Sequence, residues 1–312
     1  MRAARPRSRA RGLVAAVLAL VAVRSAIPSS KPEAAWTVTA PASVRQGEVA
    51  VVDVRSDVAI ASGSAALAGP SGSTVTRSVG FRATEAGSRF VVLIPIATTL
   101  TPGVYSIETS IELADGAPIH STGSLAVEAV AYPSEDVQLN AANTAIRTDA
   151  SPERLEQIRA LSELLATVDQ GAPRFAGPFI TPVDSTRRTS LFGDRRRYIR
   201  SDGKAETTIH YGIDFGIPTG TPVRSTGAGR VAFAGNRIST GFTAVVEHLP
   251  GVYSLYYHLS ALSVTTGQEI AAGAPIGLSG STGLSTGPHL HWEMRVNGEA
   301  VSPDWFVERA LY

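Results

Sequence analysis

The segment "STGPHLHWEM" (Ser285–Met294) carries two of the six histidines of this chain, His289 and His291, separated by one residue. Side chains two positions apart lie on the same face of a β-strand. A strand here would therefore direct both imidazoles into one space, and the side chain of Leu290 would point the opposite way, into a core. The alternative is an ordinary strand whose histidines line an exposed face, so the interpretation depends on further ligand-type residues elsewhere.

A second segment, "HYGIDFG", supplies such residues, with His210 and Asp214 in the spacing H-x-x-x-D. This spacing would place both side chains on one face of a helix. Because Gly212, Gly216 and Pro218 disfavour a helix, we expect a strand that leads into a loop.

Two histidines and one carboxylate are a ligand set typical of catalytic zinc, which lowers the pKa of a bound water to about 7. Such a site also needs a base and an oxyanion donor, for which His258 in "YYHLS" and the non-ligating member of the "HLH" pair remain. The same ligands suit non-haem iron(II) oxygenases, so they do not establish hydrolysis. The chain has no cysteine, which excludes thiolate metal sites, disulfides and thiol catalysis.

The composition is that of a globular protein with about two domains in its 312 residues. Hydrophobic residues make up 44% of the chain and charged residues 18%. The net charge of +1 gives no electrostatic case for nucleic acid as a partner.

Residues 1–30 have the pattern of an export signal, with an arginine-rich start followed by the apolar run Gly12–Val23. The run is short for a membrane span, although an uncleaved anchor remains an alternative to a cleaved signal peptide. Both predict that the body of the protein is exported to the periplasm or cell envelope, with membrane contact only through this segment.

Residues 36–130 contain successive β-branched runs separated by Gly, Pro and Ser, which predicts an immunoglobulin-like β-sandwich. Its one histidine, His120, is interpreted as structural or superficial. Residues 131–171 are predicted to be a linker with one helix, which starts at the N-cap Ser151 and Pro152. We expect this helix to pack on one of the flanking β regions rather than to bind a partner.

Residues 172–312 form the second predicted domain, again of short strands broken by glycine turns, with a hairpin through Pro250-Gly251. Five of the six histidines lie here. The segments "SLFGDRR", "HYGIDFGIPTGTPVRSTGAGRVAFAG", "YYHLS" and "STGPHLHWE" occur in an order that resembles the lysostaphin/LytM-type zinc metallopeptidases over about residues 188–305. The resemblance implies a mainly β protein with an all-β metallopeptidase domain of the duplicated hybrid motif type, and peptidoglycan as the partner.

The resemblance also implies roles for individual residues. His210, Asp214 and His291 correspond to zinc ligands, and His289 to the catalytic residue that acts on the water. His258 would assist His289 or stabilise the oxyanion.

Two further residues near the motifs are given structural roles. His248 has no catalytic counterpart and is interpreted as structural, and Glu293 as a supporting residue. The predicted function is a secreted zinc endopeptidase that cuts cross-links or stem peptides of peptidoglycan. Because some family members lack the site residues, the alternative is a catalytically silent protein that binds the cell wall or activates other hydrolases.

Overall fold

The computed structural model describes residues 17–20, 34–307 and 309–312, which are mainly β, as the sequence predicts. Apart from β1 (Val17–Leu20), the predicted export segment lies outside the described residues. Within those ranges, no helix combines the length and the apolar character that a membrane span requires.

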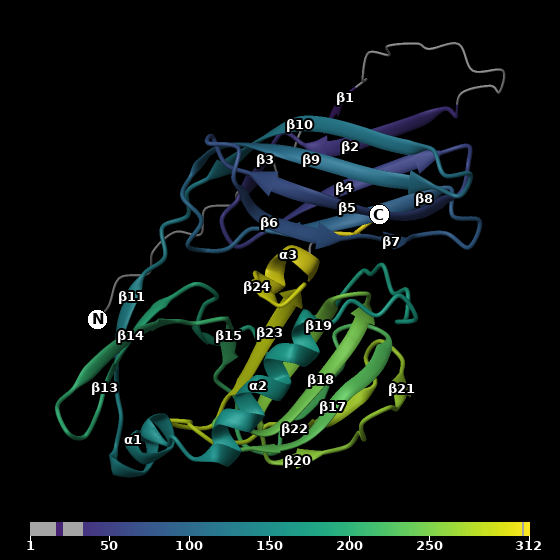
Figure 1. The fold of residues 1–312 in the computed structure, drawn as a ribbon. Coiled ribbons are helices and arrows are strands. Elements are labelled where there is room, and N and C mark those ends of the chain that lie inside the picture. Colours follow the sequence, from purple (N-terminus) through teal and green to yellow (C-terminus); the bar gives the residue numbers. More distant parts are fainter. Residues whose placement is uncertain (1–16, 21–33, 308) are drawn as a thin grey trace.

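The N-terminal half forms two five-stranded sheets that pack face to face (Figure 1). The first has the order β1-β2-β4-β8-β7, with β2 (Trp36–Pro41), β4 (Val49–Ser56), β7 (Phe81–Arg82) and β8 (Arg89–Pro95). The second has the order β3-β10-β9-β5-β6, with β3 (Ser43–Arg45), β5 (Ile60–Ala68), β6 (Thr74–Val79), β9 (Gly103–Leu113) and β10 (Pro118–Glu128).

The two sheets share an apolar core that reflects the alternation of each strand. In β9 every second residue from Tyr105 to Leu113 is buried, whereas most of the residues between them face outward. Val92 of the first sheet and Leu125 of the second belong to the same buried cluster. His120 is exposed on β10. The immunoglobulin-like class of this pair of sheets stays a prediction.

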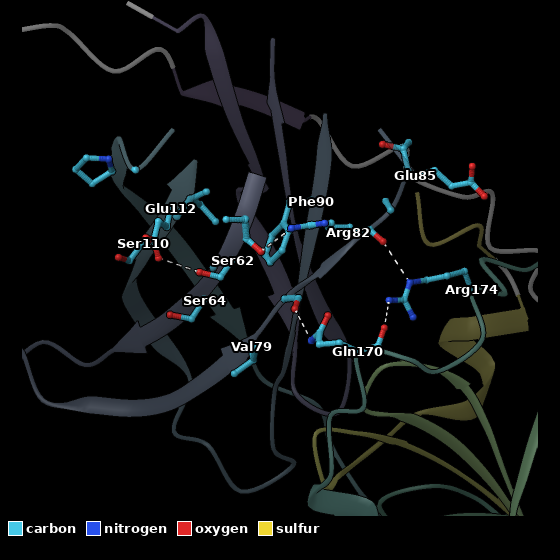
Figure 2. A pocket seen from close by; sticks show the side chains of 18 residues that line it. Ser62, Ser64, Val79, Arg82, Glu85, Phe90, Ser110, Glu112, Gln170 and Arg174 are labelled. Carbon is cyan, nitrogen blue, oxygen red and sulfur yellow. Dashed lines mark hydrogen bonds between the residues drawn. The ribbon is translucent and has the colours of Figure 1, made fainter. Parts of the chain in front are cut away.

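A groove of about 1240 Å³ opens on this sandwich (Figure 2). Gln170 and Arg174 reach it from the C-terminal side: the Gln170 amide donates to Gly80 O (3.1 Å) and Arg174 Nε to Arg82 O (3.3 Å). None of its lining residues is a histidine. Its polar contacts therefore connect the two halves of the chain and do not bring together a group of catalytic residues.

The C-terminal half is built on an eight-stranded sheet in the order β12-β15-β23-β19-β18-β17-β21, with β24 paired to β23 (Figure 1). Its strands are β12 (Arg188–Ser190), β15 (Gly212–Phe215), β17 (Gly229–Arg237), β18 (Gly241–Leu249), β19 (Val252–Leu259), β21 (Glu269–Ile270), β23 (Leu290–Val296) and β24 (Glu299–Val301). The predicted hairpin is confirmed: β18 and β19 join through Pro250-Gly251, with Gly251 at a φ of +73°.

Two three-stranded sheets complete this half. One contains β16 (Pro222–Arg224), β20 (Ala261–Leu262) and β22 (Pro275–Leu278), and the other contains β11 (Ser134–Gln138), β13 (Arg195–Ile199) and β14 (Ala205–Ile209). The duplicated hybrid motif stays a prediction.

The structure of residues 131–171, the predicted linker, differs from the prediction in two ways. It contributes β11, which pairs with β13 in parallel, and it holds two helices, α1 (Ala141–Thr148) and α2 (Pro152–Ala166). The prediction of one helix is wrong because Ile146 is the only large apolar residue of α1, so hydrophobic periodicity does not reveal it. The Asn140 side chain caps α1 by accepting from Asn143 N (2.8 Å).

Helix α2 begins where the sequence predicts and packs on the large sheet. Ser151 Oγ accepts from the backbone N of Arg154 (3.3 Å). Leu165 near the C-terminal end is buried against β18 and β19, whereas Leu155 in the first turn is exposed. The helix therefore covers one face of this sheet, as the connector interpretation expects.

The large sheet is buried on both faces, which explains the nearly continuous burial of β19. Val252 and Tyr256 join the core on one side, whereas Tyr253 and Leu255 join the cluster under α2. In β23 the alternation places Leu290 in that core, so this prediction is confirmed.

The core of the C-terminal half continues into the sandwich. Trp305 and Phe306 of α3 (Pro303–Val307) belong to the same buried cluster as Phe81 and Leu93 of the first sheet. In Figure 1, α3 lies between the two halves. One of the apolar clusters of the protein therefore spans both halves.

His248 in β18 is fully buried and satisfied at both ring nitrogens. Nδ1 lies 2.8 Å from Ala228 O and Nε2 lies 2.7 Å from Ser254 Oγ, and the ring packs edge-on against Phe179. Its contacts are those of a structural residue, and burial lowers its pKa to about 4.

This buried histidine should make the fold sensitive to acid. An unfolded histidine has a pKa of about 6.5, so below that pH the unfolded chain binds a proton that native His248 does not. The stability contribution is complete above pH ~6.5 and is lost as the pH falls to about 4, to a total of roughly 3 kcal/mol. Urea unfolding of the wild type and of His248→Gln between pH 7.5 and 4.5 measures it. An equally steep pH dependence in both proteins would contradict this prediction.

Candidate metal centre

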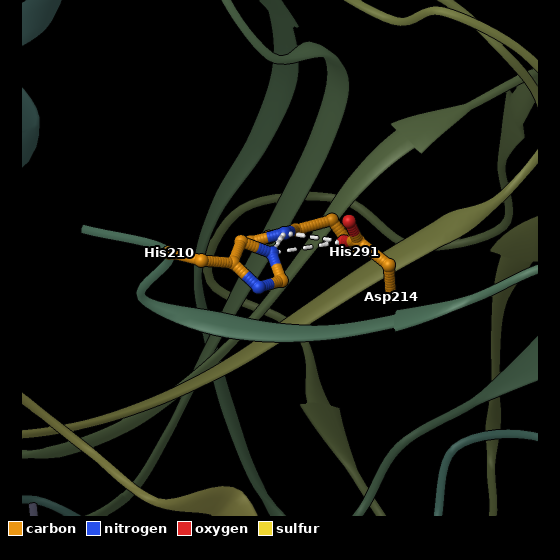
Figure 3. Close-up of side chains that lie close together, drawn as sticks. All are labelled: His210, Asp214 and His291. Carbon is orange, nitrogen blue, oxygen red and sulfur yellow. Dashed lines mark hydrogen bonds and ion pairs between the residues drawn. The ribbon is translucent and has the colours of Figure 1, made fainter. Parts of the chain in front are cut away.

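The structure brings His210, Asp214 and His291 together in one buried cluster (Figure 3). The register of β15 against β23 pairs Asp214 with His291, and His210 lies two residues before β15. His210 Nε2 lies 3.1 Å from Asp214 Oδ1 and 2.9 Å from His291 Nδ1, and the latter two atoms are 2.8 Å apart. Three potential ligand atoms therefore converge on one point.

Gly212 permits this convergence. A Cβ built on it would lie 2.3 Å from Trp292 O and 2.8 Å from His291 Nε2. Any side chain at this position would push β15 away from β23 and separate the ligands.

The hydrogen bonds behind the two rings determine which nitrogens face the cluster. His210 Nδ1 lies 2.8 Å from Leu191 O, and His291 Nε2 lies 2.9 Å from Glu293 Oε1. A carbonyl and a carboxylate only accept, so these nitrogens carry the protons. The opposite nitrogens therefore face the cluster, where each can bind a metal ion once it is unprotonated.

Arginine side chains hold the carboxylates of the site. Arg196 of β13 donates to Asp214 Oδ2 and to Glu135 Oε1 of β11, and Arg295 donates to Glu293 Oε2 (2.7 Å). Burial opposes ionisation of Asp214, but its contacts with the imidazoles of His210 and His291 hold its pKa well below its usual range. Burial also opposes ionisation of Glu293, but Arg295 and His291 lower its pKa to about 2. Both carboxylates are thus negative at neutral pH.

The two negative carboxylates, Asp214 and Glu293, favour the protonated form of His291. Burial alone would lower the pKa of this ring, but hydrogen bonds to Asp214 and Glu293 outweigh it and raise the pKa to about 9. Because a ligating nitrogen must be unprotonated, a cation bound by these residues would displace the proton.

The donor set fits zinc. A tetrahedral zinc ion with bonds of about 2.0–2.1 Å places its ligand atoms roughly 3.3 Å apart, slightly wider than the 2.8–3.1 Å found here. Two imidazole nitrogens and one carboxylate oxygen, each with an oriented hydrogen bond behind it, match three-residue catalytic sites.

His289 and His258 lie beside this cluster, with ring centroids 4.7 Å apart. His289 Nε2 is 3.8 Å from Asp214 Oδ1, and its Nδ1 lies 2.8 Å from Gly287 O. His258 Nδ1 lies 2.7 Å from Thr282 O. Burial lowers the pKa of both rings, that of His258 to about 3. Each neutral ring therefore presents an unprotonated Nε2.

The backbone of His258 is unusual, with a φ of +61°. A non-glycine residue in the left-handed region stores strain, which concentrates at functional sites. This conformation interrupts the alternation of β19 after Tyr257, whose ring stacks on His291 at 5.2 Å. The kink thus lets two consecutive residues both face the metal centre.

Three residues of the site carry no sequence signal. Arg196 lies within the run "RRR", Glu135 lies in the predicted linker, and Tyr257 has the ordinary pattern of a core strand. Only the pairing of β11 with β13 brings Glu135 to Arg196.

A groove of about 680 Å³ runs over these residues. The groove is lined by His210, Asp214 and His291 together with residues of β13, α1 and α2. The segment predicted as a linker, which contains α1 and α2, therefore forms one of its walls.

The segment that contains this cluster is similar to known proteins. Residues 208–303 match the model of peptidase family M23. The DD-carboxypeptidase/endopeptidase Mpg of Neisseria meningitidis serogroup B is 44% identical over 124 residues, which is 40% of this chain and 28% of that protein. The peptidoglycan DD-endopeptidase ShyA of Vibrio cholerae is 41% identical over 121 residues, or 39% of this chain and 28% of ShyA. The matched part thus spans about 28% of the length of these relatives.

One solved structure resembles most of the chain. A Pseudomonas aeruginosa protein assigned to peptidase M23 superposes with a TM-score of 0.56 and 25% identity. The alignment covers 84% of this chain and 93% of that one, so the similarity extends beyond residues 208–303.

Proposed function

Because residues 208–303 belong to the lysostaphin/LytM-type peptidase family M23, we propose that this protein is a zinc-dependent endopeptidase of bacterial peptidoglycan. It would be exported to the periplasm or cell envelope and hydrolyse peptide cross-links or stem peptides. The observation that carries the proposal is the convergence of two imidazole nitrogens and one carboxylate oxygen in a groove.

His210, Asp214 and His291 would hold the zinc ion. When bound, zinc would polarise the scissile carbonyl and make the attacking water more acidic. His289, with Nδ1–H held by Gly287 O, would accept the water proton at Nε2 and return it to the leaving amine.

His258 has two roles open to it, assistance of His289 or stabilisation of the oxyanion. A neutral ring whose Nδ1–H is engaged by Thr282 O has only an acceptor left at Nε2. This favours assistance, in which His258 accepts a hydrogen bond and orients the water. Donation to an oxyanion would require a protonated ring, which burial opposes.

The function is tested by digesting purified sacculi of two chemistries, one with direct D-Ala–diaminopimelate cross-links and one with glycine bridges. We expect fragments with a newly cleaved peptide amide in the mass spectra. A chelator should suppress them and added zinc should restore them. A protein that holds one zinc per chain and releases nothing from either wall would instead support the catalytically silent alternative.

A further inference from the structure

The groove over the metal centre has an uneven charge balance. Its charged lining residues are four arginines and three carboxylates, namely Arg147, Arg154, Arg187, Arg196, Glu135, Asp214 and Glu293. All three carboxylates are engaged, two by Arg196 and one by Arg295. Arg147 is paired with Glu206 (2.6 Å). The charges left over are those of Arg154 and Arg187.

Neither of these two arginines has a carboxylate within 4.0 Å among the residues that the structure describes. Arg154 donates to Asp149 O (2.7 Å) and Ser239 Oγ (3.1 Å), and Arg187 donates to Gly216 O (2.7 Å). A guanidinium has five N–H donors, so these contacts position both groups and leave most of the donors free.

The two arginines lie on opposite sides of the metal centre. Gly216, which anchors Arg187, directly follows β15. Ser239, which anchors Arg154, lies in the turn between β17 and β18. In the sheet, β15 and β18 are separated by β23 and β19, the strands that carry His291 and His258. A chain that crosses the metal centre along the groove would therefore meet one arginine on each side.

We propose that Arg187 and Arg154 are carboxylate-binding subsites at the two ends of the groove, and that the substrate is a peptide with free carboxylates on both sides of the scissile bond. The proposal rests on the proposed function. A guanidinium binds a carboxylate through two parallel hydrogen bonds, which also fixes its orientation. Direct cross-links to diaminopimelate carry a carboxylate on the carbon beside the scissile nitrogen, whereas glycine bridges carry none.

Both arginines lie outside residues 208–303, and Arg154 belongs to α2. The specificity would therefore come from segments that this chain adds to the family domain.

Binding to the zinc-loaded His289→Ala protein tests the proposal without turnover. Calorimetry compares a cross-linked diaminopimelate muropeptide dimer with the same dimer whose carboxylates are converted to carboxamides. We expect the amidated dimer to bind at least about tenfold more weakly, as loss of a charge-assisted hydrogen bond implies. Arg154→Gln and Arg187→Gln should each weaken binding of the acid dimer about tenfold and leave the amidated dimer unaffected. Arg154→Lys keeps the charge but loses the paired donors, so it should keep only part of the preference.

Matched controls exist on the same elements. Arg159 lies on α2 but is ion-paired with Glu156 and Glu163 away from the groove, and Arg188 neighbours Arg187 but is paired with Asp304. The control variants are Arg159→Gln and Arg188→Gln. Both should bind like the parent. The proposal would be overturned if the two dimers bound equally well or if the acid dimer did not bind. It would also be overturned if the glutamine variants weakened binding of the acid and amidated dimers equally. Digestion of sacculi by the wild type would still support the proposed function.

Discussion

The His289→Ala protein is expected to keep one zinc per chain and to lose turnover of peptidoglycan by a factor of about 10² to 10⁴. His289 lies outside the group of three ligand atoms, so its removal leaves the metal-binding residues in place. Its unprotonated Nε2 lies 3.8 Å from Asp214 Oδ1. Without it, proton transfer to the leaving amine lacks a positioned group.

Two measurements on one preparation check this result, the zinc content and the rate of fragment release from sacculi. His120→Ala is the matched control, because this histidine is exposed on β10 of the sandwich and should change neither quantity. A His289→Ala protein that digests sacculi at the wild-type rate would refute its role. A protein that loses its zinc would move His289 into the ligand set.

The Asp214→Asn protein is expected to lose both zinc and activity. Asparagine keeps the size of the side chain but removes the negative charge that balances the cation. Because substitution of outer partners of metal ligands costs about 10–100-fold in affinity, loss of this proposed direct ligand should exceed that range. Arg196, which is mostly buried, would lose one of its two carboxylate partners and keep Glu135.

Zinc titration with a competing chelator measures this loss, and thermal unfolding shows whether the fold survives. Asp304→Asn removes an equivalent carboxylate from an exposed pair with Arg188 and should bind zinc normally. Wild-type zinc affinity in a folded Asp214→Asn protein would exclude Asp214 from the ligand set.

The parts of the site that the sequence could predict are local in the chain. The period of a strand is enough to place Leu290 in the core opposite His291, and the turn Pro250-Gly251 specifies its own hairpin. Likewise, Ser151 and Pro152 mark the start of α2 because capping depends on neighbouring residues. The roles of the individual histidines came from a resemblance to a family, and no periodicity would supply them.

The remaining parts depend on pairing between distant segments or on backbone conformation. Glu135 reaches Arg196 only because β11 pairs with β13, about sixty positions further along the chain. The left-handed backbone of His258 is dictated by its surroundings, since no residue type requires it. Helix α1 is stabilised by a cap and by the Asn143 amide bonded to Ser285 O, contacts that leave no apolar repeat in the sequence.

Because the sandwich and α3 share an apolar core, the segment matched by family similarity differs from the unit that packs together in the structure. The segment defined by family similarity comprises residues 208–303. It ends at the first residue of α3, before Trp305 and Phe306, which belong to the same buried cluster as Phe81 of the sandwich. A chimaera joined at the family boundary would therefore cut through a hydrophobic interface, and exchange of modules in this architecture must carry the C-terminal helix and its partner sheet together.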